Sequence, residues 1–423
     1  MNQMGERIKD AALVLLVALS LVLTFGLWNT APPAEWVDAG GFVPNPAFGF
    51  TKSVEELLRP DQVEVRLPDQ SLTLLTPFSV PYEKAWEALR KTTAGEWEPV
   101  QEAAAFQQKV DMLPHIHFHF GLALTGEQLS KIVKMPDRTS THVQVRSIVM
   151  FQDTDGFHLW LTDGGTTAWQ ATIGGQSPLF EQMAQWEALP KYEKEAGSSG
   201  PIFVPKENLQ VPLVTYEVMN LPSDWLARSF FVDPTLPRRI QERDGSVLVT
   251  DGNRTVQIGA DGQEIRYTFS LPMEAESPDS LPDVKLQRAV SFVNDHGGLQ
   301  NAFLVQSEEF PEGNRIYRFR SYRNGLPIES ELTTVDVALS GNEVVEMKRN
   351  TVYLGAQLQS EMAEVKPPPV KDWKQVGKME LVYGAILANG ELRLRPVWKI
   401  SHVDHSLAVF DAITGATWPG REE

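Results

Sequence analysis

The chain has 423 residues, 42% of them hydrophobic and 22% charged, so it is long enough for two or three domains with apolar cores and is not a disordered stalk. Its formal net charge of −17 opposes binding to phosphate backbones, and no basic stripe with interleaved aromatic residues occurs, so nucleic acid is not an expected partner. The absence of cysteine excludes disulfides, thiol catalysis and cysteine-ligated metal centres.

An uncharged apolar run, Ala11–Trp28, follows a short amino-terminal tail. At about 1.5 Å per helical residue the run extends roughly 27 Å, close to the thickness of bilayer hydrocarbon. We therefore expect residues 11–30 to form a single transmembrane helix, because the apolar region of a cleaved signal peptide is shorter and no clear cleavage site follows. Arg7 and Lys9 precede the run, which predicts a cytoplasmic tail at 1–10 and an extracytoplasmic location for the rest, at a bacterial plasma membrane.

One face of this predicted helix has residues spaced for contact with another helix. They are Leu13, Val17, Ser20, Thr24 and Leu27. Small hydroxyl residues allow two helices to approach closely and to form interhelical hydrogen bonds, worth about 0.6 to 2 kcal/mol each. The alternative is a plain anchor whose serine and threonine bond to their own backbone. The pattern therefore predicts a partner-binding face inside the membrane.

The proline- and glycine-rich residues 31–52 predict a juxtamembrane linker, and a first external domain is expected at 53–196. Two capping-box patterns, at Ser53 and Thr125, predict helix starts. Apolar spacing predicts a helix that contains Tyr82, Ala85, Trp86 and Leu89, and residue composition predicts strands at His115–Phe120, Val143–Phe151 and Phe157–Thr162. The domain is thus mixed α and β.

A Gly/Ser stretch ending in Pro201 marks the clearest boundary, so a second domain is expected at 201–360. Three Asp-Gly pairs, the first at Asp244, predict the turns of a β-meander, and a helix with Leu286 on its inner face precedes further antiparallel strands. A proline triplet then separates a C-terminal α/β unit, residues 370–423, expected to pack on the second domain. The expected fold class is α+β, with mixed α/antiparallel-β domains behind the membrane helix.

Three histidines, His115, His117 and His119, alternate with apolar residues along one predicted strand. On a strand, alternate side chains share a face, so three imidazoles would lie within reach of a metal ion. Exposed histidines on an amphipathic strand, with Ile116 and Phe118 filling the buried face, explain the same pattern. Both interpretations stay open, and no metal ligand is assigned.

The other motifs do not indicate a catalytic or metal-binding site. His402-Val403-Asp404-His405 fits a polar connection between strands better than a metal site, and Asp153-Thr154-Asp155-Gly156 lacks the glutamate that would complete a calcium loop, so a hairpin turn is expected there. No serine-nucleophile, zinc-protease or phosphate-loop motif occurs. We therefore expect no catalytic or cofactor-binding residue, no cofactor and no enzyme activity.

The sequence resembles the YycH family of low-GC Gram-positive bacteria. The resemblance rests on Glu6-Arg7-Ile8-Lys9 ahead of the apolar run, on the Asp-Gly-rich middle, and on the closing Val397-Trp398-Lys399-Ile400 and Asp411-Ala412-Ile413-Thr414-Gly415. The last two segments also resemble the end of a PepSY-type unit. The implied architecture is one membrane helix and three external domains, of which the later two are similar to the companion protein YycI.

The same resemblance implies a regulatory function. YycH-like proteins associate with YycI and with the membrane sensor histidine kinase WalK (YycG), and they adjust signalling that governs cell-wall metabolism. The membrane helix is the implied contact, and the sign of regulation does not follow from the sequence. Two alternatives are an extracytoplasmic module that binds a ligand, a metal or a protease, and an envelope hydrolase.

Overall fold

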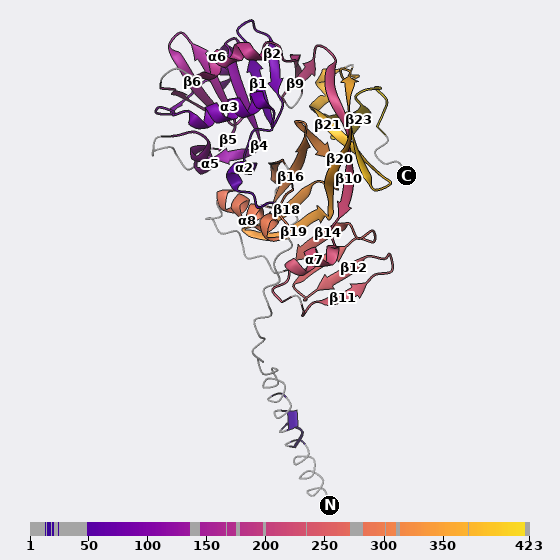
Figure 1. Cartoon of the computed structure of the whole chain (residues 1–423). Coiled ribbons are helices and arrows are strands. Elements are labelled where there is room, and N and C mark those ends of the chain that lie inside the picture. The colour runs from indigo at the N-terminus through magenta and orange to yellow at the C-terminus, as the bar shows by residue number, and fades with distance from the viewer. Residues whose placement is uncertain are drawn as a thin grey trace, which may run out of the picture. The chain divides into compact units, whose positions relative to one another are not determined.

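The structure is a computed structural model that describes residues 13, 15–17, 19–20, 24, 49–135, 144–165, 167–174, 178–197, 200–233, 235–270, 282–300, 302–309, 314–370 and 372–418 (Figure 1). The chain forms two compact units, Met1–Pro44 and Asn45–Glu423. Among the described residues, no helix has the length and apolarity needed to cross a membrane. Most of the predicted membrane span 11–30, all of the tail 1–10 and most of the linker 31–52 lie outside the described residues.

The second unit contains the named helices and strands. The helices are α2 (Val54–Leu57), α3 (Val80–Lys91), α4 (Ala103–Asp111), α5 (Gly126–Ile132), α6 (Pro178–Gln182), α7 (Ser223–Ser229) and α8 (Pro282–Asp295), with the 3-10 turns η1 (Met183–Trp186) and η2 (Trp373–Gln375). The strands of the first part are β1 (Gln62–Arg66), β2 (Leu72–Leu75), β3 (Glu98–Pro99), β4 (His115–Thr125), β5 (Gln144–Asp153), β6 (Gly156–Thr162), β7 (Ala168–Thr172), β8 (Lys191–Gly197) and β9 (Gly200–Pro205). The later strands are β10 (Leu209–Asn220), β11 (Arg238–Gln241), β12 (Val247–Thr250), β13 (Arg254–Ile258), β14 (Glu264–Phe269), β15 (Phe303–Glu309), β16 (Arg315–Arg323), β17 (Leu326–Glu329), β18 (Val335–Ser340), β19 (Glu343–Asn350), β20 (Val352–Val365), β21 (Val376–Ala388), β22 (Glu391–His402) and β23 (Leu407–Asp411).

The first nine strands form one antiparallel sheet, in the order β3-β7-β6-β5-β4-β1-β2-β8-β9 within the described residues. Its strand β4 is central, because β1 pairs with one edge of it and β5 with the other. The apolar positions of these strands, such as Val63, Phe118 and Ile148, lie on one face and pack with Tyr82 and Trp86 of α3. Burial of this face holds helices and sheet together.

The opposite face of this sheet is also covered. Val149, Phe151 and Trp160 pack there with Ala103 and Val110 of α4. In an antiparallel sheet, residues directly opposite each other point to the same side. Because His117 stands opposite Val149 and His115 opposite Phe151, the histidines share this second, covered face.

The second sheet begins at β10 and continues to the end of the chain, in the order β11-β12-β13-β14-β19-β18-β16-β17-β21-β22-β10-β20 for the described strands, with β15 beside β16 and β23 beside β22. Its pairs are antiparallel except β17 with β21. The inner face of α8, with Leu286, Ala289, Val290 and Val293, packs into the same core as β18 and β19. In Figure 1 this sheet extends from β11 and β12, at the lower right, to the yellow strands β21 and β23 above them.

Local signals in the sequence account for many element ends. Both predicted capping boxes are present, at Ser53 for α2 and at Thr125 for α5. The glycines of the three Asp-Gly pairs have φ values of 92°, 101° and 72°, and they form the turns of the β11–β14 meander as expected. These turns need positive φ, which glycine adopts without strain.

The predicted domain boundary at 196–201 falls in a hairpin. Strands β8 and β9 pair on either side of it, with Gly197 opposite Gly200, so β9 belongs to the first sheet. All of Asn45–Glu423 forms one contact unit. The partition into 53–196, 201–360 and 370–423 therefore stays a prediction about how the unit is divided.

Candidate functional site

A cluster of ionisable side chains lies on the covered face of the first sheet. Glu64 of β1 stands opposite His117 of β4, with His115 and His119 two positions away on either side. The alternation of strand side chains puts all four on one face. Glu64 has no exposed surface, His115 is 1% exposed and His117 6%.

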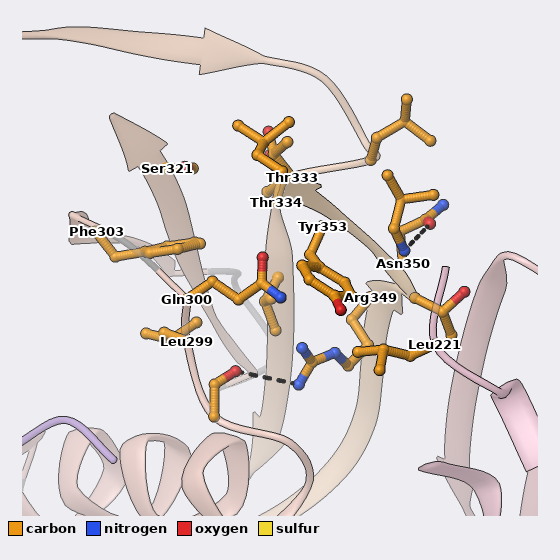
Figure 2. A pocket seen from close by; sticks show the side chains of 16 residues that line it. Leu221, Leu299, Gln300, Phe303, Ser321, Thr333, Thr334, Arg349, Asn350 and Tyr353 are labelled. Carbon is orange, nitrogen blue, oxygen red and sulfur yellow. Dashed lines mark hydrogen bonds between the residues drawn. The ribbon is translucent and has the colours of Figure 1, made fainter. Parts of the chain in front are cut away.

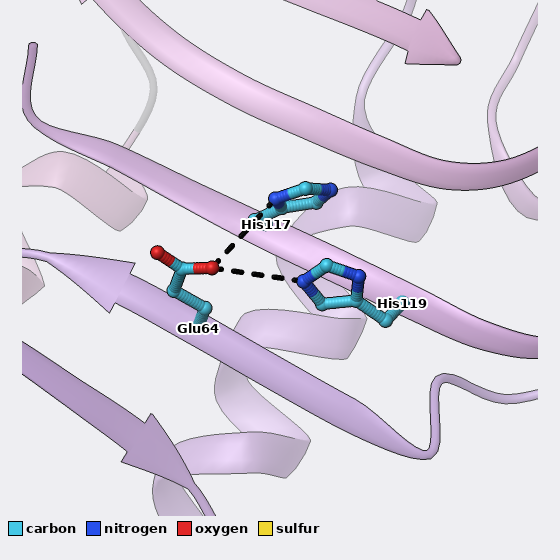
Figure 3. A group of neighbouring side chains, drawn as sticks. All are labelled: Glu64, His117 and His119. Atoms are coloured by element: carbon cyan, nitrogen blue, oxygen red, sulfur yellow. Dashed lines mark ion pairs between the residues drawn. The ribbon is translucent and has the colours of Figure 1, made fainter. Parts of the chain in front are cut away.

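The carboxylate of Glu64 is the centre of the cluster. One oxygen, Oε2, lies 3.8 Å from His117 Nδ1 and 3.7 Å from His119 Nε2 (Figure 3). The other oxygen, Oε1, lies 3.7 Å from His115 Nε2 and accepts a hydrogen bond of 3.3 Å from the Lys194 ammonium of β8. Glu64 thus contacts three imidazoles and one ammonium.

Two further contacts orient this cluster. His115 Nδ1 lies 3.1 Å from the carbonyl oxygen of Val110 and 3.0 Å from that of Leu113. Both are acceptors, so the ring carries its proton on Nδ1 and donates it to these backbone oxygens. Lys194 also lies 3.7 Å from the Asp111 carboxylate at the end of α4. The cluster is therefore held between β1, β4, β8 and α4.

The electrostatics keep Glu64 charged. Burial alone would raise the pKa of Glu64, but the polar contacts of His115 and His119 and the charge of Lys194 outweigh it and hold that pKa well below its ordinary value. Burial has the opposite consequence for His117, whose pKa it lowers well below the usual range, with the nearby His119 adding to the shift. At neutral pH the site therefore contains an ionised carboxylate beside a neutral imidazole.

Several polar atoms of the cluster lack a hydrogen-bond partner. Among the described residues, the buried atoms without one include Glu64 Oε2, both ring nitrogens of His117, and His119 Nε2. Leaving one buried polar atom unsatisfied costs about 1 to 3 kcal/mol. The three atoms that converge in Figure 3 are thus the same ones that lack partners.

A chain of polar contacts leads from this site to the second sheet. The Asp61 amide donates to the carbonyl of His119, and the Asp61 carboxylate accepts from Gln306 of β15 at 3.1 Å. Gln306 in turn accepts from Arg320, which is 4% exposed and pairs with Glu380 of β21 at 3.1 Å. Burial raises the pKa of Asp61, whereas for Glu380 the charges of Lys378 and Arg320 outweigh burial and lower the pKa to about 2.

Hollows in the described surface are poorer candidates. The one in Figure 2 has a volume of about 40 Å³, below the roughly 300 to 1,000 Å³ of ligand pockets, and is lined by residues that include Gln300, Tyr353 and Arg349. The Arg349 guanidinium donates to the His296 carbonyl at 2.6 Å, and burial lowers its pKa to about 10. A wider hollow of about 420 Å³ lies along α2 and α3, where Arg59 is paired with Glu83. In both places the arginine already has protein partners.

The structure corrects one interpretation of the histidine strand. Exposed histidines on an amphipathic strand were one expectation, and it is wrong for His115 and His117, because α4 and its apolar partners cover that face. His402 and His405 lie in or beside the turn between β22 and β23 and gather no metal-ligand cluster within the described residues. Gly156, with φ of 133°, forms the expected hairpin turn.

The predicted membrane-facing residues are only partly described. Leu13, Val17, Ser20 and Thr24 are helical and exposed, and Leu27 lies outside the described residues. Their role as a partner-binding face is untested and stays a prediction.

Glu64 and Lys194 were missed by sequence reasoning. Glu64 lies between two valines in β1, which marks it as the outward position of a strand, but one glutamate among 55 acidic residues has no distinctive signal. Lys194 is 130 residues away along the chain. Only the pairing of β1 with β4 and the fold of β8 bring them to the histidines.

Comparison with known proteins gives a family match and a structural match. A family model, described as "YycH protein, C-terminal domain", matches residues 200–369. The crystal structure of YycH from Bacillus subtilis superimposes with a TM-score of 0.67 at 11% sequence identity, covering 86% of this chain and 98% of that chain. No curated protein matches the sequence. Residues 200–369 are therefore similar in sequence to the C-terminal domain of YycH proteins, and most of the chain has the fold of Bacillus subtilis YycH.

Proposed function

We propose that this chain is a membrane-anchored, non-enzymatic accessory regulator of a sensor histidine kinase of the WalK (YycG) type, which controls cell-wall metabolism. It acts in complex with a YycI-like membrane protein. The observation that carries the proposal is the family match at 200–369 joined to a YycH-like fold over most of the chain. The absence of nucleophile and phosphate-loop motifs from the sequence agrees with a role without catalysis.

The proposal places the chain in a bacterial plasma membrane as a single-pass protein with its amino terminus in the cytoplasm. The apolar run Ala11–Trp28 supports an anchor of membrane length, and Arg7 and Lys9 support the orientation. The contact with the kinase and the YycI-like protein is the helix face that contains Ser20 and Thr24.

The mechanism is a shift between two states of the kinase. A partner helix changes activity only if it binds one kinase state better than the other. A preference of about 1 to 3 kcal/mol would change the ratio of the states about 5- to 150-fold. A few interhelical hydrogen bonds of about 0.6 to 2 kcal/mol each supply a preference of this size.

The external domains provide the assembly or sensing surface in this proposal, and the later ones are YycI-like with a PepSY-like end. The register of β22 with β23 supports that end, because Trp398 stands opposite Phe410 and Val397 opposite Asp411. The Asp411 carboxylate then accepts from the amides of Ile413 and Thr414, which closes the turn after the strand.

The test is crosslinking and co-purification from native membranes. The intact chain is compared with one whose Ala11–Trp28 segment is replaced by an unrelated apolar helix. We expect a sensor kinase and a YycI-like protein to be recovered only with the native helix. Recovery of neither partner with the intact chain would contradict the proposed function.

Point variants locate the contact. Ser20→Leu and Thr24→Leu remove the hydroxyls and add bulk, so we expect each to reduce kinase recovery while the external fold is retained. Ala18→Leu is the matched control, since helical periodicity places it about half a turn away from that face. Equal recovery for all three variants would rule out this face as the contact.

A further inference from the structure

We propose that Glu64, His117 and His119 form a binding site for one divalent transition-metal ion of the zinc class. This site is independent of the kinase proposal, because it rests on the geometry of the first sheet alone. One ligand atom from each residue lies within 4.8 Å of the other two. Two imidazoles and one carboxylate, with a fourth position left for water, are a frequent zinc ligand set.

The distances fit a site that closes slightly around the ion. With metal–ligand bonds of about 2.0 to 2.1 Å, neighbouring ligand atoms of a tetrahedral zinc site lie about 3.3 to 3.4 Å apart. The Glu64 Oε2 distances to His117 Nδ1 and His119 Nε2 are 3.8 and 3.7 Å. A movement of about 0.4 Å in each of these two pairs reaches coordination, and the two imidazole nitrogens lie within 4.8 Å of each other.

The buried unsatisfied atoms are a second, independent indication. Neither tautomer of His117 forms a hydrogen bond with Glu64 at 3.8 Å, so the carboxylate oxygen and the ring nitrogen face each other across the site without one. His117 is 6% exposed, and neither of its ring nitrogens has a hydrogen-bond partner within the described residues. A cation between these atoms would convert three unsatisfied groups into ligands.

The donor set decides the class of ion. Imidazole nitrogen favours zinc, copper, nickel and cobalt, whereas calcium and magnesium prefer oxygen ligands and larger coordination numbers. The chain has no cysteine, so no thiolate competes for the ion. Entry is on the side of His119, whose side chain is 27% exposed.

Lys194 opposes the ion and provides a sharp test. Its ammonium lies 3.3 Å from Glu64 Oε1, on the far side of the carboxylate, and a metal ion would repel it. Asp111, at 3.7 Å, offers a second acceptor toward which the lysine can turn. Lys194→Met therefore strengthens metal binding if the site is real, whereas it has no such effect on metal bound elsewhere.

The experiment measures zinc binding by the full chain, purified in detergent, stripped with a chelator and dialysed against Zn²⁺. We expect about one zinc per chain by mass spectrometry of the metal, a first shell of nitrogen and oxygen at about 2.0 to 2.1 Å by X-ray absorption, and no competition from Ca²⁺ or Mg²⁺. His119→Asn should weaken binding about a hundredfold or more. The matched control, His402→Asn with His405→Asn, removes two histidines at another site and should leave binding unchanged.

A second measurement does not depend on any variant. In the unmodified chain, zinc should protect His119 from acylation by diethyl pyrocarbonate, while His402 and His405 stay reactive. The proposal is overturned if the folded chain binds no zinc, if His119→Asn binds as tightly as the unmodified chain, or if the control variant alone loses the ion.

Discussion

The ion pair between Glu64 and Lys194 provides a quantitative test of what holds β1, β4 and β8 together. The two charged atoms lie 3.3 Å apart, with Glu64 fully buried and the Lys194 side chain 25% exposed. Their Coulomb attraction is about 5 kcal/mol at an effective dielectric constant near 20, and about 1.3 kcal/mol in bulk water. Desolvation of the carboxylate offsets most of the larger value. We therefore expect a net coupling of about 1 to 3 kcal/mol between the two residues.

The perturbations are Glu64→Gln, Lys194→Met and the double variant. Glu64→Gln should cost about 1 to 2 kcal/mol, because the released ammonium can turn to Asp111 or to solvent. Lys194→Met should cost about 2 to 4 kcal/mol, because it leaves a buried carboxylate with only the longer imidazole contacts. In the double variant neither charge remains, so the combined loss should be smaller than the sum of the single losses by the coupling energy.

The assay is native-state hydrogen exchange of peptides that span β1 and β4, in a chelating buffer that excludes metal. A local method is needed, because a chain of this size does not necessarily unfold in one step. Peptides from the β11–β14 meander serve as the internal control and should exchange at unchanged rates in all variants. Single losses that add to the double loss within about 0.5 kcal/mol would refute the coupling.

Stability should fall in acid through His296, because burial, aided by the charge of Arg349, lowers its pKa to about 3. The stability that the neutral His296 contributes is complete above pH 6.5 and falls by about 1.4 kcal/mol per pH unit towards pH 3. The thermal midpoint of His296→Gln should therefore depend less on pH than that of the unmodified chain. Glu380, whose pKa is about 2 in the folded chain, adds a second loss of stability that begins only as the pH falls below the ordinary glutamate pKa of 4.5. If the thermal midpoints of His296→Gln and of the unmodified chain change equally with pH between 6.5 and 5, His296 is not the cause of the loss. Gly325 and Gly341 both have positive φ, but only at Gly325 would an added Cβ meet another residue, at 2.1 Å from Thr76. Gly325→Ala should therefore lower the thermal midpoint more than Gly341→Ala does, by an amount equivalent to about 1 to 3 kcal/mol. Equal midpoints for the two alanine variants would contradict the close contact of this hairpin with the first sheet.

The parts of the fold that the sequence predicts are those with local causes. The capping boxes at Ser53 and Thr125, the Asp-Gly turns and the apolar face of α8 each depend on residues within about four positions of one another, so spacing alone reveals them. The order of strands within each sheet depends on pairings between distant segments. No local pattern indicates that β10 lies between β20 and β22.

The candidate site also has one part that local sequence predicts and one part that depends on distant segments. Alternation along one strand predicts that His115, His117 and His119 share a face, and the structure confirms it. Whether that face is exposed depends on α4, and the identity of the charged partner depends on β1, which is about 50 residues away along the chain. Sequence reasoning therefore finds the imidazoles and misses the carboxylate that draws them together.

The position of β10 between β22 and β20 has a consequence for the time course of synthesis. Both of its neighbours come later in the chain, since β20 ends at Val365 and β22 at His402. At about 5 to 20 residues per second, the roughly 180 residues between the end of β10 and the end of β22 require on the order of 10 to 40 s. Until β20 has been made, both edges of the finished segment lack their partners, and the edge that pairs with β22 lacks its partner for the whole interval. Unpaired amides and carbonyls along a strand edge are the kind of surface on which strands of other chains assemble. Residues 209–220 are therefore the part of this sheet whose partners are made latest relative to its own synthesis, and their strand edge is the one most open to pairing with another chain during that time.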